Sequence, residues 1–339
     1  MSIDIIITTY NRPIKVLELV HQLLTLTANH DNMIIVVDSS ESDNEELKKN
    51  TFKVKYLHSS HKNQPYQRFV GYMSSASEYL IFLDDDMEVI DNDFISKVFD
   101  ILIKPEISGI AIKFENKHED SLLAKIPTTK LTVSNKRLNQ IKGWITGWPV
   151  LKTGQFGLCG NRGKQPVGGG ITEWLSGGAF AAKRAAMFQN FNFQLFDIFE
   201  KKMGMGEDAI IGYGLSKRGT LIYHDELFFL HNDQNDSSYT IDKYAYARRV
   251  MFSRLYLSLE KQRINKRNLP AAYFHFHYYA FWRITGYLIN FVASPNKNRR
   301  DMLMGTLAGW REALKFNFRN SAETNNYWVN EAKNDIEKI

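Results

Sequence analysis

Short apolar runs alternate with helical stretches in the first ninety residues, and this alternation constrains the fold more than any other feature. Helical patterns such as Ile14–Thr27 and Gln67–Ala76 lie between several of the runs. Strands that alternate with helices predict βαβ units and a parallel sheet. We therefore expect an α/β fold with a single, mostly parallel central sheet flanked by helices. The apolar runs are Ile3–Thr8, Met33–Val37, Val54–Leu57 and Tyr79–Leu83.

Three consecutive aspartates, Asp84, Asp85 and Asp86, directly follow the fourth apolar run. Ligands of open parallel sheets bind beyond the carboxyl ends of the strands, where Thr9–Pro13 and Asp38–Ser40 also fall. Adjacent carboxylates repel one another unless a hard divalent cation, carrying a phosphate, neutralises them. On an extended backbone Asp84 and Asp86 would share one side and Asp85 would face the other. A solvated strand end that caps the next helix is the competing interpretation.

Composition sets the outer limits of the interpretation. With 339 residues and 44% hydrophobic content, the chain is long enough for a large α/β domain plus an appendage, or for two domains. Cys159 is the only cysteine, which excludes disulfides and any multi-cysteine zinc site. The first residues have no basic segment before their three isoleucines, so they predict a first strand rather than a signal peptide. We expect a cytoplasmic protein.

Charge is distributed unevenly along the chain. Residues 1–240 carry a net charge of −3 and residues 241–339 carry +9. We therefore divide the chain into residues 1–240 and a basic, aromatic-rich helical region at residues 241–339, which we expect to face something anionic. Within it, Pro270–Ser294 has nine aromatic residues and one formal charge, Arg283. This run is a poor transmembrane candidate, and an interfacial amphipathic helix or a helix packed on the body or in an oligomer interface are both open.

Two further segments carry chemistry-bearing residues. Gly157–Gly178 is glycine-dense, and it predicts either a lid over the strand ends or a plain connector. Glu207 and Asp208 begin a helix-like run, where carboxylates either complement the helix dipole or supply a general base. His231 closes an apolar strand and could bind a metal that Asp86 also holds.

No GxxxxGK[ST] loop occurs, and no GxGxxG follows the first strand, so ATPases and Rossmann dehydrogenases lose their main support. An ordered set of motifs over roughly the first 235 residues instead resembles the family 2 glycosyltransferases, which have the GT-A fold. The multiple membrane spans and the Gln-x-x-Arg-Trp signature of processive synthases are absent from the sequence. The motifs are Thr8–Pro13, Val36–Ser40, Arg68 with Gly71, Phe82–Asp86, Trp174–Phe180 and Gly206–Asp208.

The resemblance implies a role for each matching residue. Nucleotide-sugar binding would fall to residues at the ends of the first strands and in the helix before the acidic strand. Asp86 would bind Mn²⁺ or Mg²⁺ in a DXD motif. His231 is not part of the matched motifs, and its position at the end of an apolar strand makes it a second candidate ligand of that metal. Asp208 would be the catalytic base of an inverting displacement, while Glu207 and Trp174 would bind the acceptor. The residues assigned to the nucleotide sugar are Thr9, Tyr10, Arg12, Asp38, Arg68, Asp84 and Asp85.

The expected function is metal-dependent, inverting transfer of one sugar in cell-surface polysaccharide synthesis. The partners would be a nucleotide-diphosphate sugar, with UDP favoured, and a hydroxyl of a glycan or lipid-linked acceptor. An anionic membrane surface on the inner face of the cell membrane and a homo-oligomer are further partners that the basic C-terminal region suggests. A nucleotidyltransferase acting on sugar phosphates, or a non-catalytic carbohydrate-binding protein, are the alternatives. Nucleic acid is not an expected partner, because no RNA- or DNA-binding motif accompanies the basic region.

Overall fold

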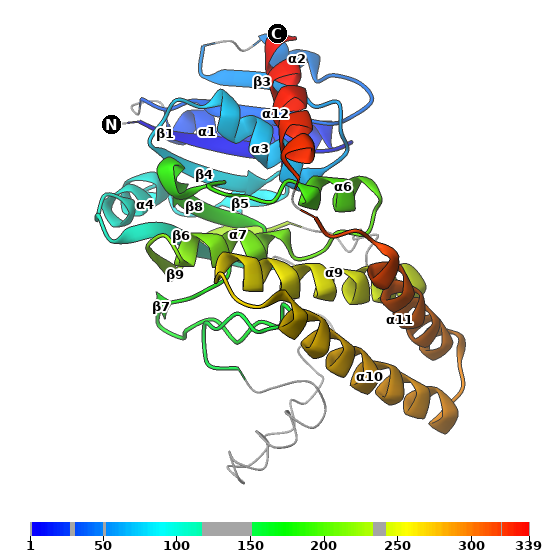
Figure 1. Cartoon of the computed structure of the whole chain (residues 1–339). Helices are drawn as coiled ribbons and strands as arrows, with labels where there is room; N and C mark the ends of the chain where they lie inside the picture. The colour runs from blue at the N-terminus through cyan, green and yellow to red at the C-terminus, as the bar shows by residue number, and fades with distance from the viewer. Residues whose placement is uncertain are drawn as a thin grey trace.

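The computed structural model describes residues 2–27, 31–49, 52–116, 151–232, 242–319 and 321–338. A central sheet forms the body of the molecule, helices cover both of its faces, and three long C-terminal helices lie along one side (Figure 1). The expected α/β class, with one sheet flanked by helices and a C-terminal helical extension, is confirmed.

The described residues form a sheet with strand order β3-β2-β1-β4-β8-β6-β9-β5, and β7 pairs with β9. Strands β1 to β4 pair in parallel, as the alternation with helices predicts. Beyond β4 the sheet is mixed, because β8 runs antiparallel to both of its neighbours while β6 and β9 are parallel to each other. The strands are β1 (Ile3–Thr9), β2 (Ile34–Asp38), β3 (Val54–His58), β4 (Tyr79–Asp84), β5 (Met87–Val89), β6 (Ile107–Asn116), β7 (Gly170–Ile171), β8 (Ala179–Lys183) and β9 (Thr220–His231).

The helices follow the sequence pattern closely in the first half of the chain. Pro13 opens the first helix and Pro65 stands in the first turn of α3, positions where the missing N–H of proline costs nothing. The helices are α1 (Pro13–Leu26), α2 (Glu45–Lys49), α3 (Gln64–Ser74), α4 (Phe94–Leu102), the 3-10 turn η1 (Arg184–Ala186), α6 (Gln194–Glu200), α7 (Glu207–Ser216), α9 (Lys243–Ile264), α10 (Leu269–Ala293), α11 (Lys297–Lys315) and α12 (Ala322–Glu337).

Alternate residues of the central strands feed two hydrophobic clusters, one on each face of the sheet. In β1, Ile5 and Ile7 join the cluster with α1 and α4, whereas Ile6 joins the cluster with α3, α6, α7, α9 and α12. These strands are buried on both faces, which explains their continuous apolar runs.

The C-terminal helices differ in how they meet this core. Leu255 of α9 and Trp328 of α12 belong to the same buried cluster as the N-terminal strands, and Tyr66 of α3 donates a hydrogen bond to Asp335 of α12 at 2.9 Å. Helices α10 and α11 form a hairpin that extends away from the sheet (Figure 1), and only part of each, such as Phe276 of α10 and Ala313 of α11, joins this cluster. Among the described residues, no helix is both long enough and apolar enough to cross a membrane.

Candidate active site

A pocket of about 610 Å³ opens at the carboxyl ends of β1 and β4. Its walls come from the segments after β1 and β2, the start of α3, the aspartates after β4, the end of α6 and one residue of α9. The pocket therefore lies where the sequence predicts a ligand, beyond the ends of parallel strands. The lining residues are Thr8, Thr9, Tyr10, Arg12, Ser39, Lys62, Asn63, Gln64, Gln67, Asp84, Asp85, Asp86, Phe199, Lys202, Gly204 and Arg249.

The three aspartates lie together at this pocket, but their side chains are not arranged as an extended backbone would arrange them. Strand β4 ends at Asp84, and Asp85 and Asp86 form the turn into β5. Because of this turn, Asp85 and Asp86 share one partner: Arg12 donates to both, at 3.0 and 2.7 Å. Asp84 faces α3 instead and accepts from Gln64 at 2.8 Å. The expectation that Asp84 and Asp86 share one side is wrong for this reason.

Asp86 and His231 meet across the sheet edge, as the metal hypothesis requires. The Nε2 atom of His231 lies 3.3 Å from Oδ1 of Asp86. Two adjacent ligands of an octahedral cation, each about 2.1 Å from it, lie about 3 Å apart, so this pair fits a cation such as Mn²⁺ or Mg²⁺. No group of three or more His, Cys, Asp or Glu residues able to hold a metal occurs in the described ranges. A cation here would take its remaining ligands from phosphate and water.

The electrostatics around Asp86 agree with a ligand that stays ionised. Burial raises the pKa of Asp86, but its contacts with His231 and Arg12 outweigh burial, so the pKa lies below its usual value. For Asp85, burial raises the pKa although Thr9 donates a hydrogen bond to it at 2.6 Å. Asp86 is thus the better of the two as an anionic metal ligand.

Arg68 connects the aspartates with the start of α7. Its guanidinium is buried and donates to Asp84 Oδ1 and to the carbonyl of Gly177, both at 2.8 Å. Its other terminal nitrogen lies 3.6 Å from Glu207. Burial raises the pKa of Asp84 to about 6, and burial together with the neighbouring charge of Asp208 raises the pKa of Glu207 to about 7. The buried guanidinium of Arg68 therefore lies between two carboxyl groups whose raised pKa values show that burial disfavours their ionised forms.

The first turn of α7 presents Glu207 and Asp208. Gly206 precedes the helix with a positive φ of 84°, which a side chain would strain, and this conformation lets the chain turn into α7. Asp208 accepts a hydrogen bond from Arg162 at 3.2 Å, and the Arg162 guanidinium lies 5.1 Å from the centre of the Trp174 ring. Arg162 and Trp174 both come from the glycine-dense segment, so this segment does cover the residue expected to be the base.

The polar N–H of Trp174 is buried and has no hydrogen-bond partner among the described residues. A buried donor of this kind usually finds a partner, and a bound ligand would supply one. We call Thr9, Tyr10, Arg12, Gln64 and Asp84–Asp86 the strand-end wall of the site. We call a second group the α7 wall: it does not line the pocket itself, and buried Arg68 connects it to Asp84. Its members are Arg162, Trp174, Glu207 and Asp208.

Other predicted residues take different positions. Thr9 and the half-exposed ring of Tyr10 line the pocket, and Lys62 lies 4.9 Å from the centre of that ring. Asp38 is buried outside the pocket lining, where its carboxylate accepts from Tyr56 at 2.8 Å and from Ser40. Its neighbour Ser39 lines the pocket instead. Asp38 thus shapes the β2 exit in the structure, and its predicted contact with the nucleotide stays a prediction.

Several pocket residues are missing from the sequence-based set. Gln67 donates to the carbonyls of Thr9 and Val37, both at 2.8 Å, and so ties the ends of β1 and β2 to α3. Lys202, which follows the end of α6, and Arg249 of α9 also line the pocket. The resemblance pointed to α3 only through Arg68. The helical period, which places Gln64 one turn before Arg68, was the sequence signal that could have found the other pocket residues of α3.

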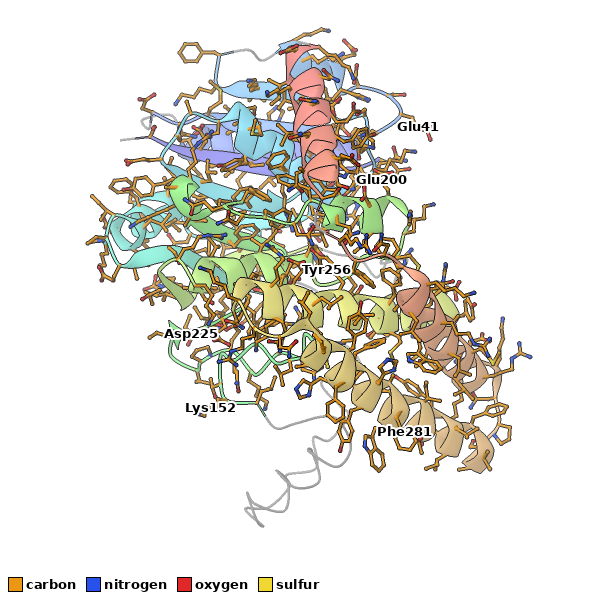
Figure 2. All side chains as sticks on the ribbon, in the orientation of Figure 1. Glu41, Lys152, Glu200, Asp225, Tyr256 and Phe281 are labelled. Carbon is orange, nitrogen blue, oxygen red and sulfur yellow. The ribbon has the colours of Figure 1, made fainter. Side chains whose placement is uncertain are left out.

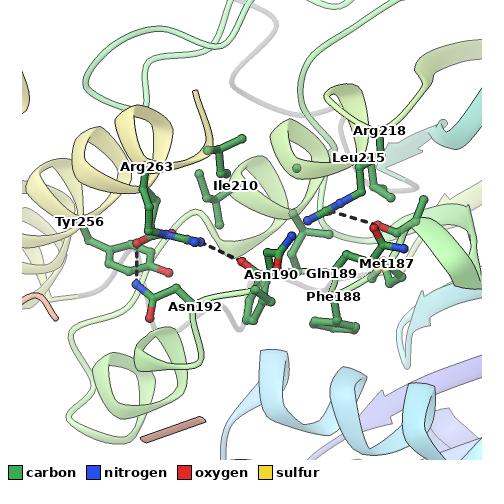
Figure 3. A pocket seen from close by; sticks show the side chains of 16 residues that line it. Met187, Phe188, Gln189, Asn190, Asn192, Ile210, Leu215, Arg218, Tyr256 and Arg263 are labelled. Atoms are coloured by element: carbon green, nitrogen blue, oxygen red, sulfur yellow. Dashed lines mark hydrogen bonds and ion pairs between the residues drawn. The ribbon is translucent and has the colours of Figure 1, made fainter. Parts of the chain in front are cut away.

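A second, much smaller pocket lies between α7, α9 and the loop after η1 (Figure 3). Its volume is about 30 Å³, room for about one water molecule. Arg218 and Arg263 donate from its walls to the carbonyls of Ala186 and Asn190, each at 3.1 Å, and so brace the loop. This pocket is too small for a sugar nucleotide.

Comparison with known proteins now separates the alternatives. Residues 4–151 match the family model described as glycosyl transferase family 2. Over these residues the chain matches the family 2 glycosyltransferases. The matched range contains the whole strand-end wall. The match favours a glycosyltransferase over a nucleotidyltransferase or a non-catalytic carbohydrate-binding protein. The enzyme is a glycosyltransferase.

Solved structures agree with the fold. Residues 1–349 of TarS from S. aureus are 13% identical, with a TM-score of 0.52, and the likeness covers 92% of this chain and 81% of that chain. At this identity the likeness shows the fold alone, which is of the GT-A type. The mannosyltransferase PcManGT from Pyrobaculum calidifontis, solved with GDP-Man and Mn²⁺, is 10% identical over 98% of this chain and 86% of its own. Its TM-score is 0.48. No curated protein matches the chain.

Proposed function

We propose that the enzyme is a metal-dependent, inverting glycosyltransferase that transfers one sugar from a nucleotide diphosphate to an acceptor hydroxyl. The observation that carries this proposal is the arrangement of the two walls. A pocket large enough for a sugar nucleotide has Asp84–Asp86 at one end, and buried Arg68 links Asp84 to the first turn of α7, where Asp208 lies.

In this proposal the strand-end wall holds the donor. Tyr10 offers a half-exposed aromatic face to the nucleobase, and Ser39 and Asp84 offer oxygens to ribose or sugar hydroxyls. Asp86 and His231 hold a divalent cation, Mn²⁺ or Mg²⁺, which as a Lewis acid neutralises the charge of a diphosphate leaving group. Arg12 lies between Asp85 and Asp86, so its guanidinium is in position to contact the same phosphates.

The α7 wall performs the proton transfer. Asp208 takes the proton of the acceptor hydroxyl as that oxygen bonds to the anomeric carbon, and the bond from this carbon to the diphosphate oxygen breaks. The nucleoside diphosphate leaves with the bonding electrons, and one displacement inverts the anomeric configuration. Arg162 now pairs with Asp208 and must give way to the acceptor. Trp174 and Glu207 then bind the acceptor beside it.

The acceptor is a glycan or lipid-linked sugar of a cell-surface polysaccharide. We favour UDP as the nucleotide and work at the inner face of the cell membrane as the location. Domain division at residue 240 also stays a proposal, and α9 contributes to the site across that boundary because Arg249 lines the pocket.

Release of UDP, GDP or TDP from the matching sugar nucleotides, with and without Mn²⁺, tests this proposal. Wild type should release one of them in a Mn²⁺-dependent reaction, and Asp86→Ala and Asp208→Ala should each reduce turnover by about 10² to 10⁴. Asp91→Ala, which removes a carboxylate that pairs with Lys97 at 2.7 Å outside the pocket lining, is the matched control. Unchanged turnover in both aspartate variants would exclude the assigned roles, and pyrophosphate release from a nucleoside triphosphate would favour a nucleotidyltransferase.

A further inference from the structure

The outer face of α10 carries a stripe of exposed apolar side chains. Phe274, Phe281 and Leu288 follow one another at intervals of seven residues, and Val292 comes four residues later, so all four lie on one side of the helix. Their exposed fractions are 69%, 61%, 48% and 69%. Figure 2 shows Phe281 on the side of α10 that faces away from α9. A surface helix normally presents polar residues on such a face.

The opposite face of the same helix is buried against the body. Ala272, Phe276, Tyr279 and Ala280 are its buried residues, and Ser258 of α9 donates to the carbonyl of Ala272 at 3.3 Å. The core therefore accounts for one apolar face of α10. It does not account for the second one, which Ile289 widens with an exposed fraction of 62%.

The charges around the stripe are mostly positive. Residues 265–300 contain six Lys and Arg residues and no Asp or Glu. Three of the cations, Lys297, Arg299 and Arg300, are exposed at the start of α11, directly beyond the end of the stripe. Aromatic and aliphatic side chains beside a cluster of bases suit the boundary between lipid headgroups and acyl chains.

We propose that the outer face of the α10–α11 hairpin docks on an anionic lipid surface. Charge decides between this partner and a second copy of the chain. Two copies paired through their stripes would bring the bases of both hairpins together. Residues 265–300 contain no acidic residue, and Asp301, which lies 3.7 Å from Arg300, offsets only one of the six bases. A layer of anionic headgroups meets both the cations and the apolar side chains.

Docking at this face would fix the orientation of the active site relative to the lipid surface. Gly305 and Gly309 of α11 pack directly on the backbone of α9, where a Cβ on either would collide with the carbonyl of Tyr244 or of Arg248. Arg249, the next residue, lines the site pocket. The hairpin is thus attached rigidly to the helix that closes the pocket, and a bound surface would hold the pocket at a fixed orientation.

Flotation of the full chain with vesicles tests the proposal. We expect wild type to float with phosphatidylcholine vesicles containing phosphatidylglycerol and not with phosphatidylcholine alone. Phe281→Asp with Leu288→Asp, and separately Lys297→Glu with Arg299→Glu, should each reduce the bound fraction about tenfold or more. Phe52→Asp removes an 87% exposed phenyl group elsewhere on the surface and should bind as wild type.

Unchanged melting temperatures would show that these variants fold. Failure of wild type to float, equal flotation with neutral vesicles, or flotation insensitive to both double variants would overturn the proposal. A lipid-free dimer that Phe281→Asp dissociates would assign the stripe to a second copy instead. Glycosyltransferase activity on a soluble acceptor does not depend on this face, so the two proposals fail separately.

Discussion

The two walls of the site are built in different ways. The strand-end wall takes nearly all of its residues from the first ninety positions, and each follows a buried parallel strand or opens the next helix. The α7 wall takes Arg162 and Trp174 from a segment with little regular structure that α9 holds in place: Arg254 donates to the carbonyl of Cys159 at 3.0 Å, and Lys261 donates to that of Phe156.

This difference suggests a division of labour. The strand-end wall is fixed by the sheet itself, so its geometry can stay constant while the rest of the chain varies. The α7 wall depends on packing between distant segments, and in the proposed function changes there would alter the acceptor without disturbing the donor. Arg68 is the one described side chain that forms ion pairs with both walls, through Asp84 and Glu207.

Substitution of Arg68 should have the largest effect on stability. Arg68→Met removes a buried cation and leaves Asp84 and Glu207 without it, so the free energy of unfolding should fall by about 3 to 5 kcal/mol. Urea denaturation measures this change. Lys62→Met, which removes an exposed cation at the rim of the same pocket, should leave the free energy of unfolding nearly unchanged. A similar small loss for Arg68→Met would show that the walls are not coupled through this residue.

Glu207 should make stability depend on pH. Its pKa is about 7 in the fold against a usual 4.5, so between these values the native state keeps a proton that the unfolded chain has released. Stability therefore falls as pH rises through this window, by on the order of 2 to 3 kcal/mol from this group. Glu207→Gln should lose this part of the decline, as thermal denaturation from pH 4.5 to 7.5 would reveal. Parallel pH profiles for both proteins would contradict the assignment.

A smaller effect is expected within the strand-end wall. Gln67→Leu leaves the buried carbonyls of Thr9 and Val37 without their side-chain donor, and the free energy of unfolding should fall by about 1 to 3 kcal/mol. Gln22→Leu removes two comparable hydrogen bonds between a glutamine side chain and the backbone of Val89, and it provides a control away from the pocket. Equal losses of unfolding free energy in the two variants, together with unchanged nucleotide binding by Gln67→Leu, would show that the ends of β1 and β2 do not need the hydrogen bonds of Gln67.

The same difference explains what could be predicted from the sequence. Asp84–Asp86 and Thr9–Arg12 could be assigned to the pocket because the end of an apolar run in the sequence marks the carboxyl end of a buried strand. The turn at Asp85 and Asp86 could not, since it arises from the pairing of β5 with β9, whose residues are more than 130 positions apart. Arg162 could not be placed either, because its contact with Asp208 depends on how α9 holds residues 156–160. The antiparallel pairing of β8 with β4 could not be predicted either, because the two strands are about 100 residues apart in the sequence.

Calorimetric titration of UDP, GDP and TDP, with and without Mn²⁺, tests the central claim most directly. The account predicts that wild type binds one of these nucleotides only with Mn²⁺, that Asp86→Ala loses this binding, and that Asp208→Asn keeps it. Nucleotide binding that is equally tight without Mn²⁺ and in Asp86→Ala would contradict the claim that the acidic strand end holds a metal-bound donor.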